Sequence, residues 1–484
     1  MQRRPRPRRC CGRRSRGGRR SLRASISSPA EEGLKLGEQI EDLAQFVART
    51  GWDDMPEAVH RRAKLVLLDT IGVTLAGAAR PEVIGLRDRL LAGPGRGATV
   101  LAPGLPQADI RTAALLNGIA ARAVELCEGS RGLQPSPHIL PGVLAIAEQR
   151  RMGGRAMLGA FVLGYEVAGR LNRGYTQRAF SHPNGQLSLL AAAAAGARLH
   201  GLDGAGISLA MRVATTMLMT PSYNNTVAGG TTLNLPAGLG AVAGTLAPEM
   251  AAAGFTAQAD AIEEALGVMV GAGFSPAKLN DDLGQHWEIL ENYFRFYACC
   301  NPIHAALDSL AETLAALKPR PAEVARIEVR TFAFASVMRN PAPPNYFASK
   351  YSLPHAAAVL IARGGLGFAE IDDSSLEDPV VARLRPLVQI AEDPAMTARS
   401  TPTLRPARVT LTLKDGRSAT AARENSVRDT LKEDPEPQVR AKFRELAAVH
   451  LTPAGIDALE AAVDCCEEWQ TMGDLTEPLR QHAL

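Results

Sequence analysis

The chain has 484 residues, of which 46% are hydrophobic and 21% are charged. This length allows two to four domains of roughly 100–200 residues each, and the composition excludes a wholly disordered chain, a collagen and a small disulfide scaffold. Aromatic residues make up only 5%, while Ala and Gly are abundant, so we expect a core of small side chains on closely packed helices.

The formal net charge of +4 comes from an arginine-rich tail. Residues 1–30 hold eleven Arg and no Lys, Asp or Glu, and without them the net charge is −7. We expect a disordered tail over residues 1–34 and a mildly acidic body without a nucleic-acid surface. Three interpretations of the tail stay open: an organelle-targeting peptide, a binder of an anionic partner, and upstream sequence from a misplaced start. The last is favoured because Pro5, Pro7 and the glycines at 17–18 prevent an amphipathic helix.

Helical periodicity dominates from about Gly37 to residue 289. Asp54 and Glu57 resemble a capping box, and after them apolar residues recur at spacings of three and four as far as Leu75. Further helices are expected over residues 111–126, 141–172, 186–200, 205–218, 235–253 and 258–269. The pattern predicts a large helical domain over residues 35–289.

The pattern changes near residue 290. A strand is predicted over 325–334 and a hairpin over 408–421 with an Asp-Gly turn, together with helices over 302–318 and 352–364. Residues 436–467 are helical again and should pack back on the first domain. The predicted fold class is therefore mainly α with a smaller α+β domain. A large all-helical domain built from both chain ends (35–289 and 431–484) would carry an inserted α+β domain over 290–430.

The cysteine and apolar patterns indicate a cytoplasmic protein. The seven cysteines include no CxxC pair and do not form a secreted disulfide framework, so we expect reduced thiols and no metal site. The uncharged stretches 179–197 and 213–248 are either Ala-rich or interrupted by Pro and Asn, so no membrane span is expected. An iron–sulfur lyase is a minor alternative, because Cys127, Cys299 and Cys300 are poorly spaced ligands.

Two polar clusters in the helical domain are candidates for chemistry. Glu125 and Glu128 end a helix before the Gly/Pro loop that holds Gln134 and His138, where carboxylates can act as general acids or bases. The alternative is a solvated helix end. His182 lies just before an Ala-rich helix, where outward-facing N–H groups bind anions and keep an imidazole neutral. The alternative is a loop histidine that caps the helix.

Two further clusters lie after residue 290. Arg295 can clamp a carboxylate, and it precedes Cys299 and Cys300, which are more often simply small buried residues. Lys350 opens a predicted helix and forms another candidate anion site. The glycines at 229–230 lack a following Gly-Lys-Ser/Thr, and no GxGxxG follows a strand, so nucleotide binding is not predicted.

Taken in chain order, eight short segments resemble the MmgE/PrpD family over roughly residues 38–470. They lie at 64–72, 117–128 (which begins Asn117-Gly118), 141–148, 164–170, 182–185 (His182-Pro183-Asn184-Gly185), 253–256, 297–304 and 350–354. The family includes 2-methylcitrate dehydratase, cis-aconitate decarboxylase and iminodisuccinate epimerase. The resemblance implies a helical domain plus an α+β lid and a cofactor-independent homodimer. It also implies an active site between the domains for elimination, decarboxylation or epimerisation of a small polycarboxylate.

Several positions depart from the family pattern. Glu125 and Glu128 stand where the family usually carries Asp, and Gln134 stands where it often has His. No Lys occurs near Leu233, and Arg295 replaces the usual Lys before the cysteines. These departures point away from methylcitrate dehydration itself.

Two hypotheses follow from these observations. In the first, the chain is a divergent lyase or isomerase that acts on a small di- or tricarboxylate. The expected class is a carbon–oxygen lyase similar to 2-methylcitrate dehydratase, and its specific reaction stays open. His182 acts as base or acid and Arg295 binds a substrate carboxylate across the interdomain gap. The remaining expected site residues are Glu125 and Glu128, which orient the site or relay a proton, and His138, Gln134, Cys300 and Lys350, which contact the substrate. In the second, the chain is an inactive paralogue that binds a carboxylate metabolite or a partner.

Overall fold

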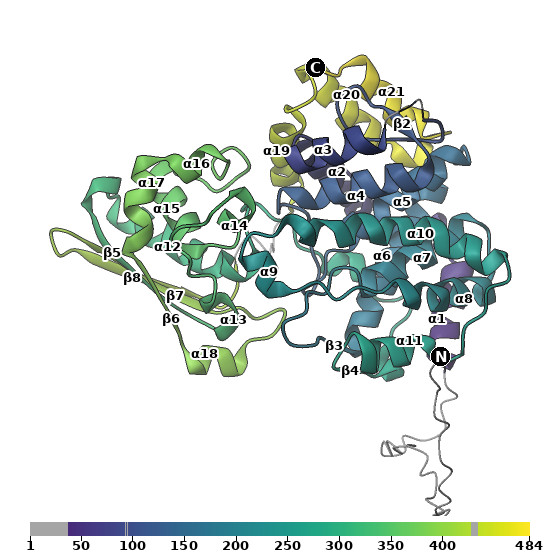
Figure 1. Ribbon diagram of the computed structural model, residues 1–484, viewed down its shortest axis with the longest axis horizontal. Helices are drawn as coiled ribbons and strands as arrows, with labels where there is room; N and C mark the ends of the chain where they lie inside the picture. The colour runs from purple at the N-terminus through teal and green to yellow at the C-terminus, as the bar shows by residue number, and fades with distance from the viewer. Residues whose placement is uncertain (1–36, 92, 94, 427–433) are drawn as a thin grey trace, which may run out of the picture. The chain divides into compact units, whose positions relative to one another are not determined.

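Helices make up most of the computed structural model, which describes residues 37–91, 93, 95–426 and 434–484 (Figure 1). All of these residues belong to one compact unit. The tail predicted over residues 1–34, with Cys10 and Cys11, lies outside the described residues. Within the described ranges, none of the helices combines the length and the apolar character that a membrane span needs.

The part of the chain before residue 290 is helical, as predicted. Its helices are α1 (Glu38–Arg49), α2 (Glu57–Ala78), α3 (Pro81–Leu90), α4 (Ile110–Ala123), α5 (Pro135–Gln149), α6 (Gly154–Gly174), α7 (Leu187–Leu199), α8 (Gly204–Ala214), α9 (Tyr223–Val227), α10 (Leu235–Ala252) and α11 (Ala261–Glu264). Two short antiparallel pairs join β1 (Ala98–Thr99) to β2 (Gln107–Ala108) and β3 (Tyr175–Thr176) to β4 (Gly273–Phe274).

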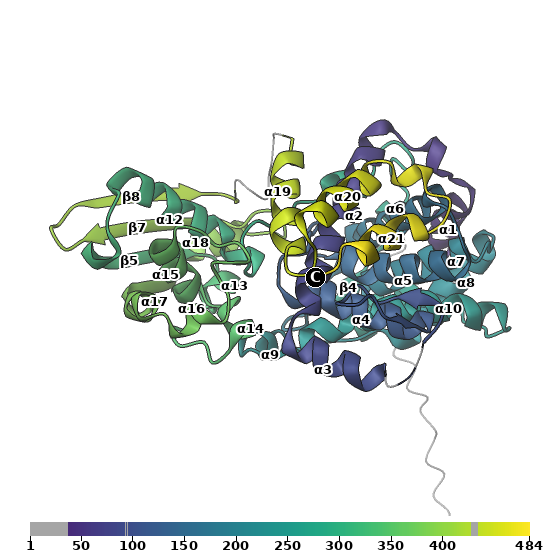
Figure 2. The same ribbon diagram turned by 90° about the horizontal axis from the view of Figure 1, so that it is seen from above.

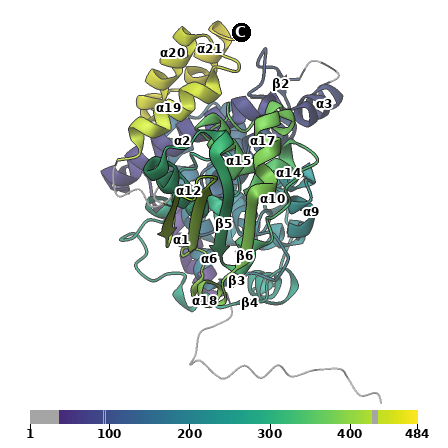
Figure 3. The ribbon, with the colours of Figure 1, turned by 90° about the vertical axis from the view of Figure 1, so that its left-hand side faces the viewer.

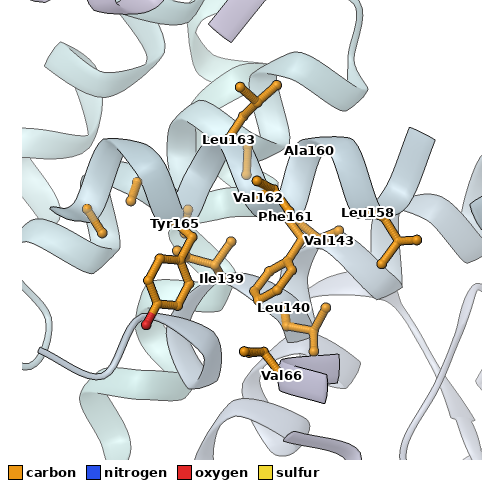
Figure 4. Packing of buried hydrophobic residues seen from close by; sticks show 14 of the residues in the cluster. Val66, Ile139, Leu140, Val143, Leu158, Ala160, Phe161, Val162, Leu163 and Tyr165 are labelled. Carbon is orange, nitrogen blue, oxygen red and sulfur yellow. The ribbon is translucent and has the colours of Figure 1, made fainter. Parts of the chain in front are cut away.

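Small side chains let these helices pack closely. A Cβ added to Gly118 of α4 would lie 2.7 Å from the Cα of Gly238 in α10, and one on Gly196 would lie 1.8 Å from the Gly244 carbonyl oxygen. Elsewhere the core is filled by larger side chains, as where Phe161 lies close to other buried residues of α2 and α5 (Figure 4). The expected small-residue packing is therefore confirmed at the helix crossings.

Two local predictions in this part are wrong. The single helix predicted over 141–172 is interrupted, because Arg151 adopts a left-handed φ of 55° and Gly154 packs directly on the backbone of Cys466. The capping box at Asp54 is also absent: Pro56 precedes α2 without a side-chain cap, and the Asp54 carboxylate accepts the Gly51 N–H instead.

The part after residue 290 contains a four-stranded sheet in the order β6-β5-β7-β8. Its strands are β5 (Val324–Thr331), β6 (Val388–Glu392), β7 (Ala407–Leu413) and β8 (Ser418–Arg423), with β5 and β6 parallel and side by side (Figure 3). Helices α12 (His304–Leu317) and α15 (Leu353–Arg363) cover one face of the sheet (Figure 1). The shorter helices of this part are, in chain order, α13 (Ala333–Ser336), α14 (Tyr346–Ser349), α16 (Ser374–Glu377), α17 (Pro379–Leu384) and α18 (Pro394–Arg399).

Alternating side chains explain why these segments form strands. Ile327 and Val329 of β5 are buried against the helices, while Arg326 and Arg330 are exposed on the other face. The hairpin β7–β8 turns at Asp415-Gly416, as predicted. The predicted fold class, mainly α with a smaller α+β part, is thereby confirmed.

The last helices return to the first part of the chain. They are α19 (Glu436–Ala447), α20 (Pro453–Asp464) and α21 (Gly473–Gln481), and α19 packs on α2 (Figure 2). The Lys442 ammonium donates to the carboxylate of Asp69 at 2.6 Å and to the Leu126 carbonyl oxygen at 2.6 Å, and both charged side chains are buried. The domain limits at residues 35, 290 and 431 remain a prediction.

Lys442→Met should destabilise the protein strongly, because it leaves the Asp69 carboxylate buried without its counter-charge. We expect a loss of about 3–5 kcal/mol in the free energy of unfolding, measured by urea denaturation. The matched control is Lys64→Met, which removes a partly exposed ion pair with Glu467 and should cost less than about 1 kcal/mol. Equal losses in the two variants would contradict a structural role for the buried pair.

Candidate active site

A cavity of about 490 Å³ collects polar side chains from both parts of the chain. Its polar lining residues include Glu125, Arg131, Gln134, Asn172, Arg178, His182, Tyr223, Arg295, Cys300, Tyr351 and Arg405. Phe180, Phe332 and Phe334 add an aromatic wall. His182 and Arg295, which are predicted from the sequence to act together, therefore line the same cavity.

The Glu125 carboxylate is held between two guanidinium groups. Just past the end of α4, the backbone of Glu125 turns into the left-handed region with a φ of 56°. Its carboxylate accepts hydrogen bonds from Arg122 and, at 2.5 Å, from Arg295. The Tyr351 hydroxyl donates to the same carboxylate at 2.9 Å, so this buried cluster joins the segment around α4 to the segment before α15.

This cluster carries one positive charge in excess. Burial raises the pKa of Glu125, but the charges of Arg122 and Arg295 outweigh that effect and hold the pKa at about 2. Glu125 is thus ionised at neutral pH, and two arginines share one carboxylate. The alternative of a solvated helix end is wrong, because Glu125 is only 1% exposed. The excess charge favours binding of an anion in the cavity.

His182 lies in a loop that is tied to the segment before α9. Its backbone N–H donates to the Pro221 carbonyl oxygen at 2.8 Å. Its ring stacks on Tyr223, with the ring centroids 5.2 Å apart and the ring planes at 13°. The Asn184 N–H donates to the Nδ1 of His182 at 3.2 Å. Residue Gln186, not His182, precedes α7, so the alternative that His182 caps this helix is wrong.

The His182 imidazole is neutral at physiological pH. Burial, and then the positive charge of Arg122, lower its pKa to about 3. Because the Asn184 N–H can only donate, Nδ1 is the acceptor, and the proton of the neutral ring resides on Nε2.

His138 is placed behind the cavity and holds the loops that form it. Its Nδ1–H donates to the Gln134 carbonyl oxygen at 2.8 Å, and its Nε2 accepts the Gly185 N–H at 3.2 Å. Gly185 has a φ of 79°, and a Cβ there would meet Met219 at 2.8 Å. His138 therefore connects Gln134, which lines the cavity, to the loop of His182, and burial lowers its pKa to about 4.

Glu128 and Cys300 have different surroundings. Glu128 is absent from the cavity lining and accepts hydrogen bonds from the Tyr165 hydroxyl at 2.6 Å and the Ser136 N–H at 3.1 Å, while burial raises its pKa. Cys300 lines the cavity with its sulfur 3.3 Å from the Tyr223 hydroxyl, and burial raises its pKa to about 12. Cys299 and Cys300 are both buried small residues, as the simpler interpretation expects.

Lys350 lies apart from the cavity. Its ammonium donates to the Ile371 carbonyl oxygen at 2.5 Å and sits 4.1 Å from the centre of the Tyr346 ring. Lys350 is fully buried and is absent from the cavity lining. The start of α15 is capped by Ser352, so the expected anion site at this helix is not formed by Lys350.

Three residues of the site were missed by sequence reasoning. Arg122 precedes Glu125 by three positions, and this helical spacing is the signal that would have paired them. Tyr223 and Arg405 stand in segments without a recognisable pattern. Among the side chains that the structure describes, no group of three His, Cys, Asp or Glu could hold a metal ion.

Comparison with known proteins identifies both parts of the chain. The family model of the MmgE/PrpD N-terminal domain matches residues 41–277, and that of the MmgE/PrpD C-terminal domain matches residues 297–468. A cis-aconitate decarboxylase of Aspergillus terreus is 24% identical over 310 residues, covering 59% of this chain and 61% of that protein. A second one, from Aspergillus terreus strain NIH 2624 / FGSC A1156, is 24% identical over 305 residues, covering 58% and 61%.

The chain thus matches about three-fifths of the length of these curated relatives. The two family domains follow one another in order and together span most of the described residues. Both domains contribute residues to the lining of the cavity, among them Glu125 in the first domain and Arg405 in the second. This chain belongs to the MmgE/PrpD family.

Proposed function

We propose that this protein is a lyase or isomerase that acts on a small di- or tricarboxylate, at a carbon next to a carboxylate. The observation that carries the proposal is the cavity shared by a neutral imidazole, His182, and an arginine, Arg295. The excess positive charge of the cluster around Glu125 attracts a polyanion. Because the His182 ring is uncharged, it can contact the carbon chain of that polyanion without the cost of burying a charge. The reaction needs no cofactor, and the protein works as a cytoplasmic homodimer.

The relatives support the same class of substrate. Their name states that they decarboxylate cis-aconitate, which is a tricarboxylate that loses one carboxyl group as CO₂. Loss of a proton or of CO₂ next to a carboxylate leaves negative charge on the remaining carboxyl oxygens. Groups that stabilise this developing charge accelerate either reaction.

The tautomer of His182 determines whether the ring first acts as a hydrogen-bond donor or as a base. With Nδ1 accepting the Asn184 N–H, the ring presents Nε2–H as a donor to a substrate carboxyl oxygen. This arrangement stabilises the developing enolate, in the manner of a neutral imidazole electrophile. To accept a proton at Nε2, the ring must first move its own proton to Nδ1 and give up the Asn184 hydrogen bond.

The second candidate is a carboxylate-binding protein without turnover. It is favoured by the absence of any lysine from the described lining of the cavity and by the fully ionised, doubly paired state of Glu125. Thermal-shift measurements with citrate, cis-aconitate and 2-methylcitrate separate the two candidates. Stabilisation without product formation supports a binder, whereas formation of product removes it.

His182→Ala, which has no side-chain donor, should abolish most turnover on any substrate found in a panel of di- and tricarboxylates. Because the variant loses the donor at Nε2, we expect kcat to fall by about 10²–10⁴ while KM changes little. The control is His200→Ala, at the far end of α7 and outside the cavity lining. Wild-type turnover in His182→Ala would show that the assignment of His182 is wrong.

The protonation state of His182 can be observed directly. In protein labelled with ¹⁵N-histidine, the signal that disappears in His182→Gln should show a neutral ring with its proton on Nε2. With a pKa of about 3, below the ordinary value of about 6.5, the ring gains a proton only near pH 3. The signal should therefore not titrate between pH 8 and pH 5. A midpoint near pH 6.5, or a proton on Nδ1, would refute the neutral-donor role.

A further inference from the structure

Arg405 is a cavity-lining arginine with no role in the chemistry proposed for His182 and Arg295. It lies in the loop between α18 and β7, is partly buried, and lines the same cavity as His182. Its backbone N–H donates to the Glu424 carbonyl oxygen at 3.0 Å and to the Asn425 side-chain oxygen at 2.8 Å. The Asn425 amide nitrogen donates in turn to the Thr403 carbonyl oxygen at 2.7 Å. The loop is thus attached to the end of β8, which fixes the position from which the side chain extends.

The guanidinium of Arg405 differs from those of the other arginines in the cavity. Arg295 is paired with Glu125, and Arg131 lies 3.3 Å from the Glu291 carboxylate. Arg178 donates to backbone carbonyl oxygens. Across the described residues, Arg405 makes hydrogen bonds through its backbone and none through its guanidinium.

An uncompensated guanidinium in a fixed loop is suited to bind a carboxylate. Its planar set of donors matches two carboxylate oxygens, and it loses no internal ion pair when a ligand arrives. Arg405 also lines an adjoining cavity of about 350 Å³, together with Arg131 and Tyr293. It therefore stands where the two cavities meet.

We propose that Arg405 binds a second carboxylate of the substrate, away from the reacting carbon, and so selects for polycarboxylates. This inference rests on the proposed function, and it adds a specificity-determining residue to the same site. Arg295 and the excess positive charge of the cluster around Glu125 hold the carboxylate next to His182, and Arg405 holds a distal carboxylate. A monocarboxylate occupies one of these positions and a tricarboxylate occupies both.

The test measures binding of tricarballylate by titration calorimetry. This molecule carries three carboxylates and has neither a hydroxyl group nor a double bond, so elimination does not consume it. Arg405→Gln should weaken its binding roughly tenfold to a hundredfold, because a charge-assisted pair is lost. Arg405→Lys should recover part of the affinity. The melting temperature of both variants should stay at the wild-type value, because the guanidinium has no protein partner to lose.

The matched control is Arg408→Gln, because Arg408 is an exposed arginine on β7 that is absent from the cavity lining. The affinity of this variant for tricarballylate should stay within about twofold of wild type. With a turned-over substrate, Arg405→Gln should raise KM and leave kcat nearly unchanged, whereas His182→Ala lowers kcat. Equal tricarballylate affinity in wild type and Arg405→Gln would overturn the subsite alone. No binding to the wild-type protein at millimolar concentration would overturn the polycarboxylate function itself.

Discussion

The geometry of the site depends on one shared carboxylate. Glu125 accepts hydrogen bonds from Arg122 and Arg295 and from the Tyr351 hydroxyl, all of them buried. Without this carboxylate, two guanidiniums would be left in the interior without a counter-ion, at a cost of several kcal/mol, on the order of that for a broken buried ion pair. With it, the cluster is stable and still carries one positive charge. The same arrangement fixes the end of α4 and joins the two parts of the chain, and the charges of Arg122 and Arg295 add to the burial that keeps His182 neutral.

The fold was predictable where the pattern is local. The alternation in β5, the Asp-Gly turn of β7–β8 and the Ala-rich α7 each follow from neighbouring residues. The interruption between α5 and α6 had a local signal in the pair Gly153-Gly154, which the predicted helix ignored. The contact of Gly154 with the backbone of Cys466, which is distant in the sequence, was not predictable. A periodic apolar pattern that runs through such a contact looks like one continuous helix.

The site was predictable in part, for a related reason. Spacing and residue type identified His182, Arg295 and Glu125, and the structure brings these three to one cavity. The same criteria could not distinguish a side chain that lines a cavity from one that supports its wall, so His138 and Lys350 were expected to contact the substrate. Contacts between residues far apart in sequence decide that difference, as the hydrogen bond from Gly185 to His138 shows.

The buried pair of Asp69 and Lys442 has a consequence for how the protein is made. The two residues are 373 positions apart, so α2 emerges from the ribosome long before the ammonium that neutralises its carboxylate. Until α19 has been synthesised, Asp69 has no counter-charge and the surface of α2 that α19 covers is open to solvent. The first domain therefore completes its core only after the second has been translated, and a nascent chain that stalls in between exposes apolar helix surfaces to chaperones.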